Sequence, residues 1–233
     1  MSMPKRPYWR KLIAFLRMPL AAKMDYIENL TARLKGVLYY RHIFASFGKG
    51  SVIYKPMLIG NPRFIHIGNN VTIRNGVRLE AVISGPSKPP ELRIGDNVNI
   101  EQNVHIICHS RVIVGDDVSI TGHCAIVDVT HPYEDIYNPA KIGERLSPDD
   151  SCVEIGERSF LGFGTVVLPN VRIGTYCVVG AQSLVTKDIP DYSVVVGRPA
   201  RVVRSFDHVL GTWVAAPLGK EQFGAQGDAF HDS

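Results

Sequence analysis

The sequence predicts a mainly β protein built around a parallel β-helix, on two observations. Aliphatic residues recur every six positions through the middle of the chain, and glycine follows many of them directly. The same region lacks the alternation, with turns about every 8 to 12 residues, that indicates a β-sandwich. It also lacks the amphipathic helices between strands that a βαβ protein needs. A parallel β-helix is therefore the fold class that we expect.

The hexads run from position 53 to position 185, with short slips and two longer interruptions. Their aliphatic members are Ile53, Ile59, Ile65, Ile67, Ile73, Leu79, Ile94, Ile100, Ile106, Val112, Val114, Ile120, Ile126, Ile155, Leu161, Val167, Ile173, Val179 and Val185. A helix repeats about every 3.6 residues and a strand about every 2, so neither alone gives a period of six. Short strands joined at corners do, with three hexads in each triangular coil of about 18 residues. We expect about five or six coils stacked roughly 4.8 Å apart, with aliphatic side chains inside and small residues easing the corners.

The composition excludes several classes of protein. The 233 residues are 45% hydrophobic and 21% charged, as in ordinary globular proteins, which excludes wholesale disorder and a multi-span membrane protein. Arg17 and Pro19 interrupt the most apolar early stretch, so no run approaches the roughly 18 apolar residues of a membrane span. The four cysteines include no Cys-x-x-Cys pair, and no convincing cleavage site follows the apolar stretch. These two features favour a reducing, cytoplasmic setting. The net charge is only +4, and we expect no nucleic-acid partner.

The segment 1–49 is expected to be basic and helical. Apolar residues recur at spacings of three and four from Trp9 to Leu38, and Pro19 should divide the segment into two helices. Ten Lys or Arg stand there against Asp25 and Glu28. Two interpretations stay open: residues 1–40 make peripheral contact with anionic lipid at the inner face of the membrane, or the basic residues form a solvated face.

Written as an aliphatic residue, then glycine, then four variable positions, the hexads resemble those of the hexapeptide-repeat acyltransferases. Within that family the chain resembles sugar and polysaccharide O-acetyltransferases, including galactoside acetyltransferases. The resemblance implies a left-handed β-helix over 50–204, a hand that the spacing alone does not determine. It also implies acetyl-CoA as co-substrate. Beyond the β-helix, 205–233 carries little signal, and we expect a mobile tail.

The excursion 127–152 interrupts the hexads and contains the candidate catalytic residue. It opens with Asp128, His131, Pro132 and Tyr133. A histidine pKa near working pH suits a general base, although a single loop histidine is as well explained by polar surface. In the sugar O-acetyltransferases that this chain resembles, a His-Pro at the start of such a loop bears the catalytic histidine. The resemblance therefore implies that His131 is catalytic.

Cations near the end of the β-helix suggest where the coenzyme binds. Lys187, Arg201 and Arg204 lie beside glycines and prolines, which suits a phosphate-rich ligand, although a basic rim without function would look the same. The order Gly-Ala, Thr-Lys-Asp-Ile-Pro and Gly-x-Pro-Ala-Arg resembles the family's coenzyme A segment. The acyl-CoA contacts implied by the resemblance are Phe163, Ala181, Thr186, Lys187, Arg201 and Arg204.

The resemblance also implies an acceptor site, on the coil that holds Glu101, Asn103, His105 and His109. Glu101 and His109 differ from the residue types of the galactoside enzymes, so we expect an acceptor other than a simple galactoside. A zinc site is not expected, because the spacing of His105, His109 and His123 does not match that of the γ-class carbonic anhydrases, which share the fold.

The function predicted from these residues is acetyl transfer from acetyl-CoA to a sugar hydroxyl, in surface polysaccharide or lipopolysaccharide biosynthesis. The hydroxyl would attack the thioester directly with His131 as general base, and backbone N–H groups near Gly162 or Gly180 are candidates to hold the oxyanion. The resemblance implies a homotrimer with each active site between two neighbours. The alternatives are N-acetylation of an amino-sugar nucleotide, acetylation of an antibiotic, and a β-helix scaffold without catalysis.

Overall fold

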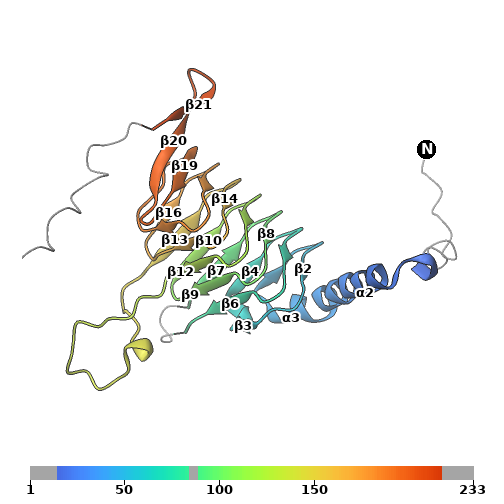
Figure 1. The fold of residues 1–233 in the computed structure, drawn as a ribbon. Helices are drawn as coiled ribbons and strands as arrows, with labels where there is room; N and C mark the ends of the chain where they lie inside the picture. The colour runs from blue at the N-terminus through green and yellow to red at the C-terminus, as the bar shows by residue number, and fades with distance from the viewer. Residues whose placement is uncertain (1–14, 84–88, 217–233) are drawn as a thin grey trace, which may run out of the picture.

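The computed structural model describes residues 15–83 and 89–216, and it confirms the predicted β-helix. Short parallel strands stack into three sheets that wind around one axis, and a helix projects from the N-terminal end of the stack (Figure 1). The arrangement is consistent with the left-handed sense that the resemblance implies. The expected helical residues before position 15, most of the loop at 84–91 and the end of the chain after position 216 lie outside the described residues.

Each coil contributes one strand to each of three sheets, here called A, B and C. Sheet A contains β1 (Ser46–Phe47), β4 (Ile65–Ile67), β7 (Glu91–Ile94), β10 (Arg111–Val114), β13 (Cys152–Ile155) and β16 (Arg172–Ile173). Sheet B contains β2 (Val52–Ile53), β5 (Thr72–Ile73), β8 (Asn99–Ile100), β11 (Ser119–Ile120), β14 (Phe160–Leu161), β17 (Val178–Val179) and β19 (Ser193–Val196), followed by two antiparallel strands. Sheet C contains β3 (Leu58–Gly60), β6 (Arg78–Ala81), β9 (His105–Cys108), β12 (Ala125–Val127), β15 (Val166–Val167) and β18 (Leu184–Val185).

The predicted inward residues form the core. All of the hexad aliphatics named above are buried except Ile59, which is half-buried. In sheet B each inward residue pairs in register with its equivalent in the next coil, as Ile100 does with Ile120. Full burial of one such side chain stabilises the fold by about 1.5–3 kcal/mol. The ladder of inward side chains therefore holds each coil in register on the one below.

The coil length changes along the β-helix. In the last coils Leu161 pairs with Val179, eighteen residues later, as the hexad pattern predicts. Ile100 pairs with Ile120, twenty residues later. The two extra residues lie at the slip between Val112 and Val114, which are both buried in β10. This coil thus has a four-residue strand in sheet A, where the later strand β16 has two residues.

The hexad glycines serve a different purpose from the one expected. We expected them to ease the corners, yet the residues with left-handed backbone at the corners are mostly polar, such as Asn97 and Asp117. Gly156 has no such backbone, but a Cβ placed on it would lie 2.5 Å from the carbonyl carbon of Gly174 in the next coil. The small residue is needed because successive coils touch at this point.

The N-terminal segment is helical up to the first coil. Pro19 precedes α2 (Leu20–Lys35), in agreement with the predicted break, and α2 continues through a π-helix (Gly36–Tyr40) into α3 (Arg41–Ile43). Two 3₁₀ turns lie later in the chain, at Pro62–Phe64 and Ile142–Glu144. No helix in the described part of the chain is long and apolar enough to cross a membrane.

Part of the expected mobile tail is ordered. β20 (Arg201–Asp207) runs antiparallel to β19, and β21 (Thr212–Ala215) runs antiparallel to β20. The rings of Phe206 and Trp213 pack with centroids 5.6 Å apart. The hexad pattern ends before this hairpin, because antiparallel strands need no corner every six residues. The β-sheet structure therefore extends beyond the predicted boundary at 204.

We predict that Gly156→Ala lowers the free energy of unfolding by about 1–3 kcal/mol, because the new methyl group would overpack the contact with the next coil. Gly143→Ala is the matched control, since a Cβ there meets no atom within 4 Å. Its expected effect is within about 0.5 kcal/mol. Denaturant unfolding of both variants measures the difference, and equal stabilities would contradict the coil-contact role of Gly156.

Candidate active site

The predicted site residues lie along the two edges of sheet C. At one edge, the corner between sheets B and C, the residues that follow β8, β11, β14 and β17 stack into a column. Asn103 Nδ2 lies 3.3 Å from His123 Nε2, and the rings of His123 and Phe163 have centroids 5.0 Å apart. Asn103 and Phe163, sixty residues apart in the sequence, thus lie in one column with His123 between them.

Glu101 and Ala181 belong to the same corner. Glu101 follows β8, and its Oε2 lies 4.0 Å from Nε of Arg74 in the preceding coil. Ala181 follows β17 and is exposed. The N–H groups of Gly162 and Gly180 donate to carbonyls of the next coil at 2.8 Å. These two N–H groups therefore belong to the coil ladder, and they are not available to hold an oxyanion.

The outward face of sheet C connects the two edges and is mostly apolar. His105 lies between Arg78 and Ala125 in the ladder of strands. After His105 in the chain, the outward side chains of sheet C are half-buried and apolar. They are Ile107, Ala125, Val127, Val166 and Leu184. Among the described residues, sheet C carries an outward ion pair only before His105, between Arg78 and Glu80 of β6, whereas sheet A carries ion pairs in several coils, such as Arg93 with Glu91 and Arg172 with Glu154. The part of sheet C that follows His105 is therefore an apolar surface that can pack against another surface.

At the other edge of sheet C, a buried carboxylate holds the start of the excursion. Asp128 is fully buried, and its carboxylate accepts hydrogen bonds from the backbone N–H groups of His109, Ser110 (2.8 Å) and Arg111 (2.7 Å). Ser151 Oγ donates to the backbone carbonyl of Asp128, which fixes the point where the excursion returns. His109 is only 7% exposed, so its ring lies inside this corner.

His131 is exposed on the excursion, and one of its ring nitrogens is engaged. Nδ1 lies 2.8 Å from the carbonyl oxygen of Arg145. A carbonyl oxygen only accepts hydrogen bonds, so Nδ1 carries the proton in the neutral ring and Nε2 keeps its lone pair. Nε2 is therefore the nitrogen that can take a proton from a substrate.

Arg145 organises the loop around His131. Its guanidinium donates to the backbone carbonyls of Asp135 (3.0 Å), Asn138 (2.7 Å) and Ala140 (2.7 Å). These bonds close the excursion on itself, while the carbonyl of the same residue accepts from His131. Sequence analysis did not select Arg145, because nothing in the motif separates it from other loop arginines.

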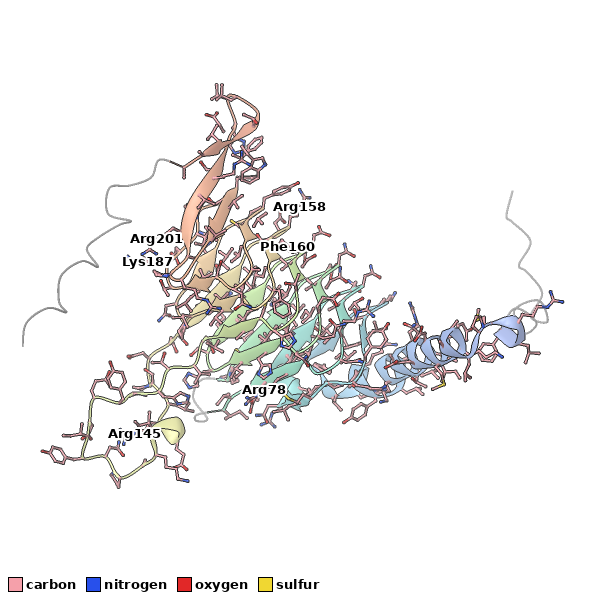
Figure 2. The ribbon with its side chains drawn as sticks, in the orientation of Figure 1. Arg78, Arg145, Arg158, Phe160, Lys187 and Arg201 are labelled. Atoms are coloured by element: carbon pink, nitrogen blue, oxygen red, sulfur yellow. The ribbon has the colours of Figure 1, made fainter. Side chains whose placement is uncertain are left out.

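The expected coenzyme contacts Lys187 and Arg201 lie near each other at the C-terminal end of the β-helix (Figure 2). Ala200 N–H donates to the carbonyl of Leu184 at 2.8 Å, which brings the start of β20 beside β18 and Lys187. Within 15–83 and 89–216, neither side chain forms an ion pair, and neither does Arg204. Three exposed cations are therefore available to an anionic ligand. Thr186 lies beside them, directly after β18.

Within a single chain, these cations and His131 do not lie close together. In Figure 2 Arg145, the hydrogen-bond partner of His131, lies on the loop that projects from the β-helix, well away from Lys187 and Arg201. The β-helix that separates them is rigid, because its inward side chains are buried along its length. Bringing the two groups together requires either a large movement of the loop or a second copy of the chain.

The cysteines are not suited to nucleophilic catalysis. Burial raises the pKa of the Cys108, Cys124, Cys152 and Cys177 thiols, and the neighbouring Asp128 carboxylate raises that of Cys108 further. All four thiols are therefore protonated near neutral pH. No group of three or more His, Cys, Asp or Glu side chains within the described ranges is arranged to hold a metal ion.

Comparisons with known proteins agree on the family. A family model described as bacterial transferase hexapeptide (six repeats) matches residues 152–187. WbbJ of Escherichia coli, provisionally assigned as a lipopolysaccharide biosynthesis O-acetyltransferase, is 33% identical over 170 residues, which cover 71% of this chain and 84% of WbbJ. The galactoside O-acetyltransferase of Lactococcus lactis is 34% identical over half of this chain and 54% of its own length.

A solved structure shares the fold. It is a variant of AntD, an N-acyltransferase from Bacillus cereus, in complex with dTDP and coenzyme A. The similarity covers 76% of this chain and 89% of that chain, with a TM-score of 0.59 and 24% identity. At this identity the likeness extends to the fold alone.

We predict that Arg145→Ala loosens the excursion without weakening the β-helix, because the guanidinium bonds only carbonyls of its own loop. A chymotrypsin-type protease should then cut after the exposed Tyr133 or Tyr137 several times faster, while the unfolding midpoint stays unchanged. Lys141→Ala in the same loop is the control, since Lys141 makes only an exposed ion pair with Glu144. Equal cutting rates in both variants would contradict the organising role of Arg145.

Proposed function

The chain belongs to the hexapeptide-repeat transferase family and is an acetyltransferase, and we propose that it moves an acetyl group from acetyl-CoA to a sugar hydroxyl in surface polysaccharide or lipopolysaccharide biosynthesis. The observation that carries the acceptor class is the 33% identity to the lipopolysaccharide relative, which extends over 84% of that protein. The use of acetyl-CoA agrees with a cytoplasmic protein.

His131 is the general base of the proposed reaction. Nε2 takes the hydroxyl proton as the sugar oxygen attacks the carbonyl carbon of the thioester. When the tetrahedral intermediate collapses, the carbon–sulfur bond breaks, and the imidazolium returns the proton to the coenzyme A sulfur. The Nδ1–H bond to the carbonyl of Arg145 supports this role, because it holds the ring with Nε2 unprotonated.

The coenzyme is held at the C-terminal end of the β-helix in this proposal. The exposed cations Lys187, Arg201 and Arg204 bind its phosphate groups, while Phe163, Ala181 and Thr186 contact the rest of the acyl-CoA. The acceptor contacts Glu101, Asn103 and His109 from the sequence analysis remain proposals. Of these three, Glu101 and Asn103 have side chains on the outside of the corner, whereas the ring of His109 is buried.

We propose a homotrimer in which His131 of one subunit meets the coenzyme residues of the next. Two observations support it. The loop with His131 projects away from Lys187 and Arg201 of its own chain (Figure 2). The apolar outward face of sheet C, with Ile107, Val127 and Val166, offers a surface for a neighbour.

We predict that His131→Ala lowers kcat by about 10²–10⁴ while leaving coenzyme binding intact, because the histidine transfers protons and is not among the residues proposed to bind the coenzyme. Binding is read from thermal unfolding, since a ligand at 100 times its Kd stabilises the folded state by about 2.7 kcal/mol. His66→Ala on the outward face of sheet A is the control. An unchanged kcat in His131→Ala would refute the catalytic assignment, and the absence of any coenzyme A shift in the wild type would favour a non-catalytic scaffold.

We also predict that two inactive variants restore each other. His131→Ala and Lys187→Ala chains, coexpressed with different tags and purified as mixed trimers, should recover about a third of wild-type sites. A site takes one residue from each of two neighbours, and one of the three interfaces in a mixed ring joins an intact His131 to an intact Lys187. The activity is measured at coenzyme concentrations where Lys187→Ala alone is impaired. If each site lay within one chain, the mixed trimers would show no more activity than the separate variants.

A further inference from the structure

Helix α2 attaches to the β-helix through its polar side. Tyr54 O–H donates to Asn29 Oδ1, and Lys55 Nζ lies 3.1 Å from Glu28 Oε1. Ala32 is the one fully buried residue of α2 and lies on the same side. Asp25 is also on this side of α2, and it lines a polar cavity of about 350 Å³ together with Tyr54. The contact between α2 and the β-helix is therefore built from polar and small side chains.

The opposite side of α2 is apolar and exposed. We call it the outward stripe, and its members are Leu20, Met24, Ile27, Leu30 and Leu34. They follow one another at spacings of three and four, which places them on one side of a helix. Their exposed fractions run from 44% for Ile27 to 76% for Leu20. A helix of a globular protein normally turns such a stripe toward the core, so α2 has the reverse orientation.

The charges around the outward stripe have one sign. Both acidic residues of α2, Asp25 and Glu28, are on the side of the β-helix. The remaining charged residues of α2 are Lys23, Arg33 and Lys35, and Arg41 follows in α3. Long basic side chains beside an apolar stripe can reach the headgroups of anionic lipids while their stems cover apolar surface. A second copy of α2 docked on the stripe would instead bring cations against cations, which is unfavourable.

We propose that α2 binds the surface of an anionic phospholipid membrane, with the outward stripe in the acyl-chain boundary and Lys23, Arg33 and Lys35 at the headgroups. Figure 1 supports the geometry, because α2 projects from the end of the β-helix and can lie on a flat surface beside it. The inference does not depend on the proposed acetyl acceptor. It assigns α2 as the membrane-binding element of the chain.

The test is flotation of the full chain with lipid vesicles. Wild-type protein should float with vesicles of phosphatidylcholine and phosphatidylglycerol, float far less with phosphatidylcholine alone, and lose most of its binding at high salt. The double variant Ile27→Glu with Leu34→Glu should bind the mixed vesicles at least about tenfold more weakly, because it places two carboxylates in the stripe. Its polar contact with the β-helix is untouched, so its unfolding midpoint should match the wild type.

The matched control is Val178→Glu with Val196→Glu. These two valines are 38% and 42% exposed, close to the 44% and 49% of Ile27 and Leu34, and they lie in sheet B away from α2. The control has the same change in charge and should still float. Wild-type protein that fails to float, or a stripe variant that floats as well as the control, would overturn the proposal. If vesicles are not bound and the stripe variant changes the mass of the assembly in sedimentation, the stripe is a subunit contact instead.

Discussion

The in-register stacking of buried aliphatic side chains is the constraint on which the rest of this structure depends. Each coil is held on the next by pairs such as Ile100 with Ile120 and Ile120 with Leu161. Once the inward positions are fixed, the corners must also align, because every strand contains only a few residues. Residues far apart in the sequence then form columns, and Asn103, His123 and Phe163 come together for this reason. The site is thus a consequence of the ladder.

The same ladder allows a long excursion without loss of register. Ile120 pairs with Leu161 although 127–152 lies between them, because both ends of the excursion are bonded to one corner. The N–H groups of residues 109–111 donate to the carboxylate of Asp128, which takes the place of backbone carbonyl acceptors. His131 therefore extends from a fixed base, and the hydrogen bonds of Arg145 limit its freedom further. Rigid attachment and local hydrogen bonding are what a catalytic loop requires.

The uneven charge of the chain corresponds to a division of the molecule. The excess of basic residues lies in the segment 1–49, and α2 shows how it is arranged, with acids toward the β-helix and bases around an apolar stripe. The exposed cations Lys187, Arg201 and Arg204 form a second, separate group at the other end of the β-helix. In our proposals, one basic region binds a lipid surface and the other binds a phosphate-containing coenzyme.

The sequence by itself determined the β-helix, its inward residues, the break at Pro19 and the family, because a period of six and its glycines are local features that repeat many times. It also indicated His131 and the cation set, through short motifs. It did not predict the hairpin of β20 and β21, whose antiparallel pairing leaves no hexad pattern. Nor did it predict the roles of Asp128 and Arg145, or the outward direction of the stripe on α2. Only the tertiary structure decided these, because hydrogen-bond partners and the direction of a helix face depend on contacts between residues distant in the chain.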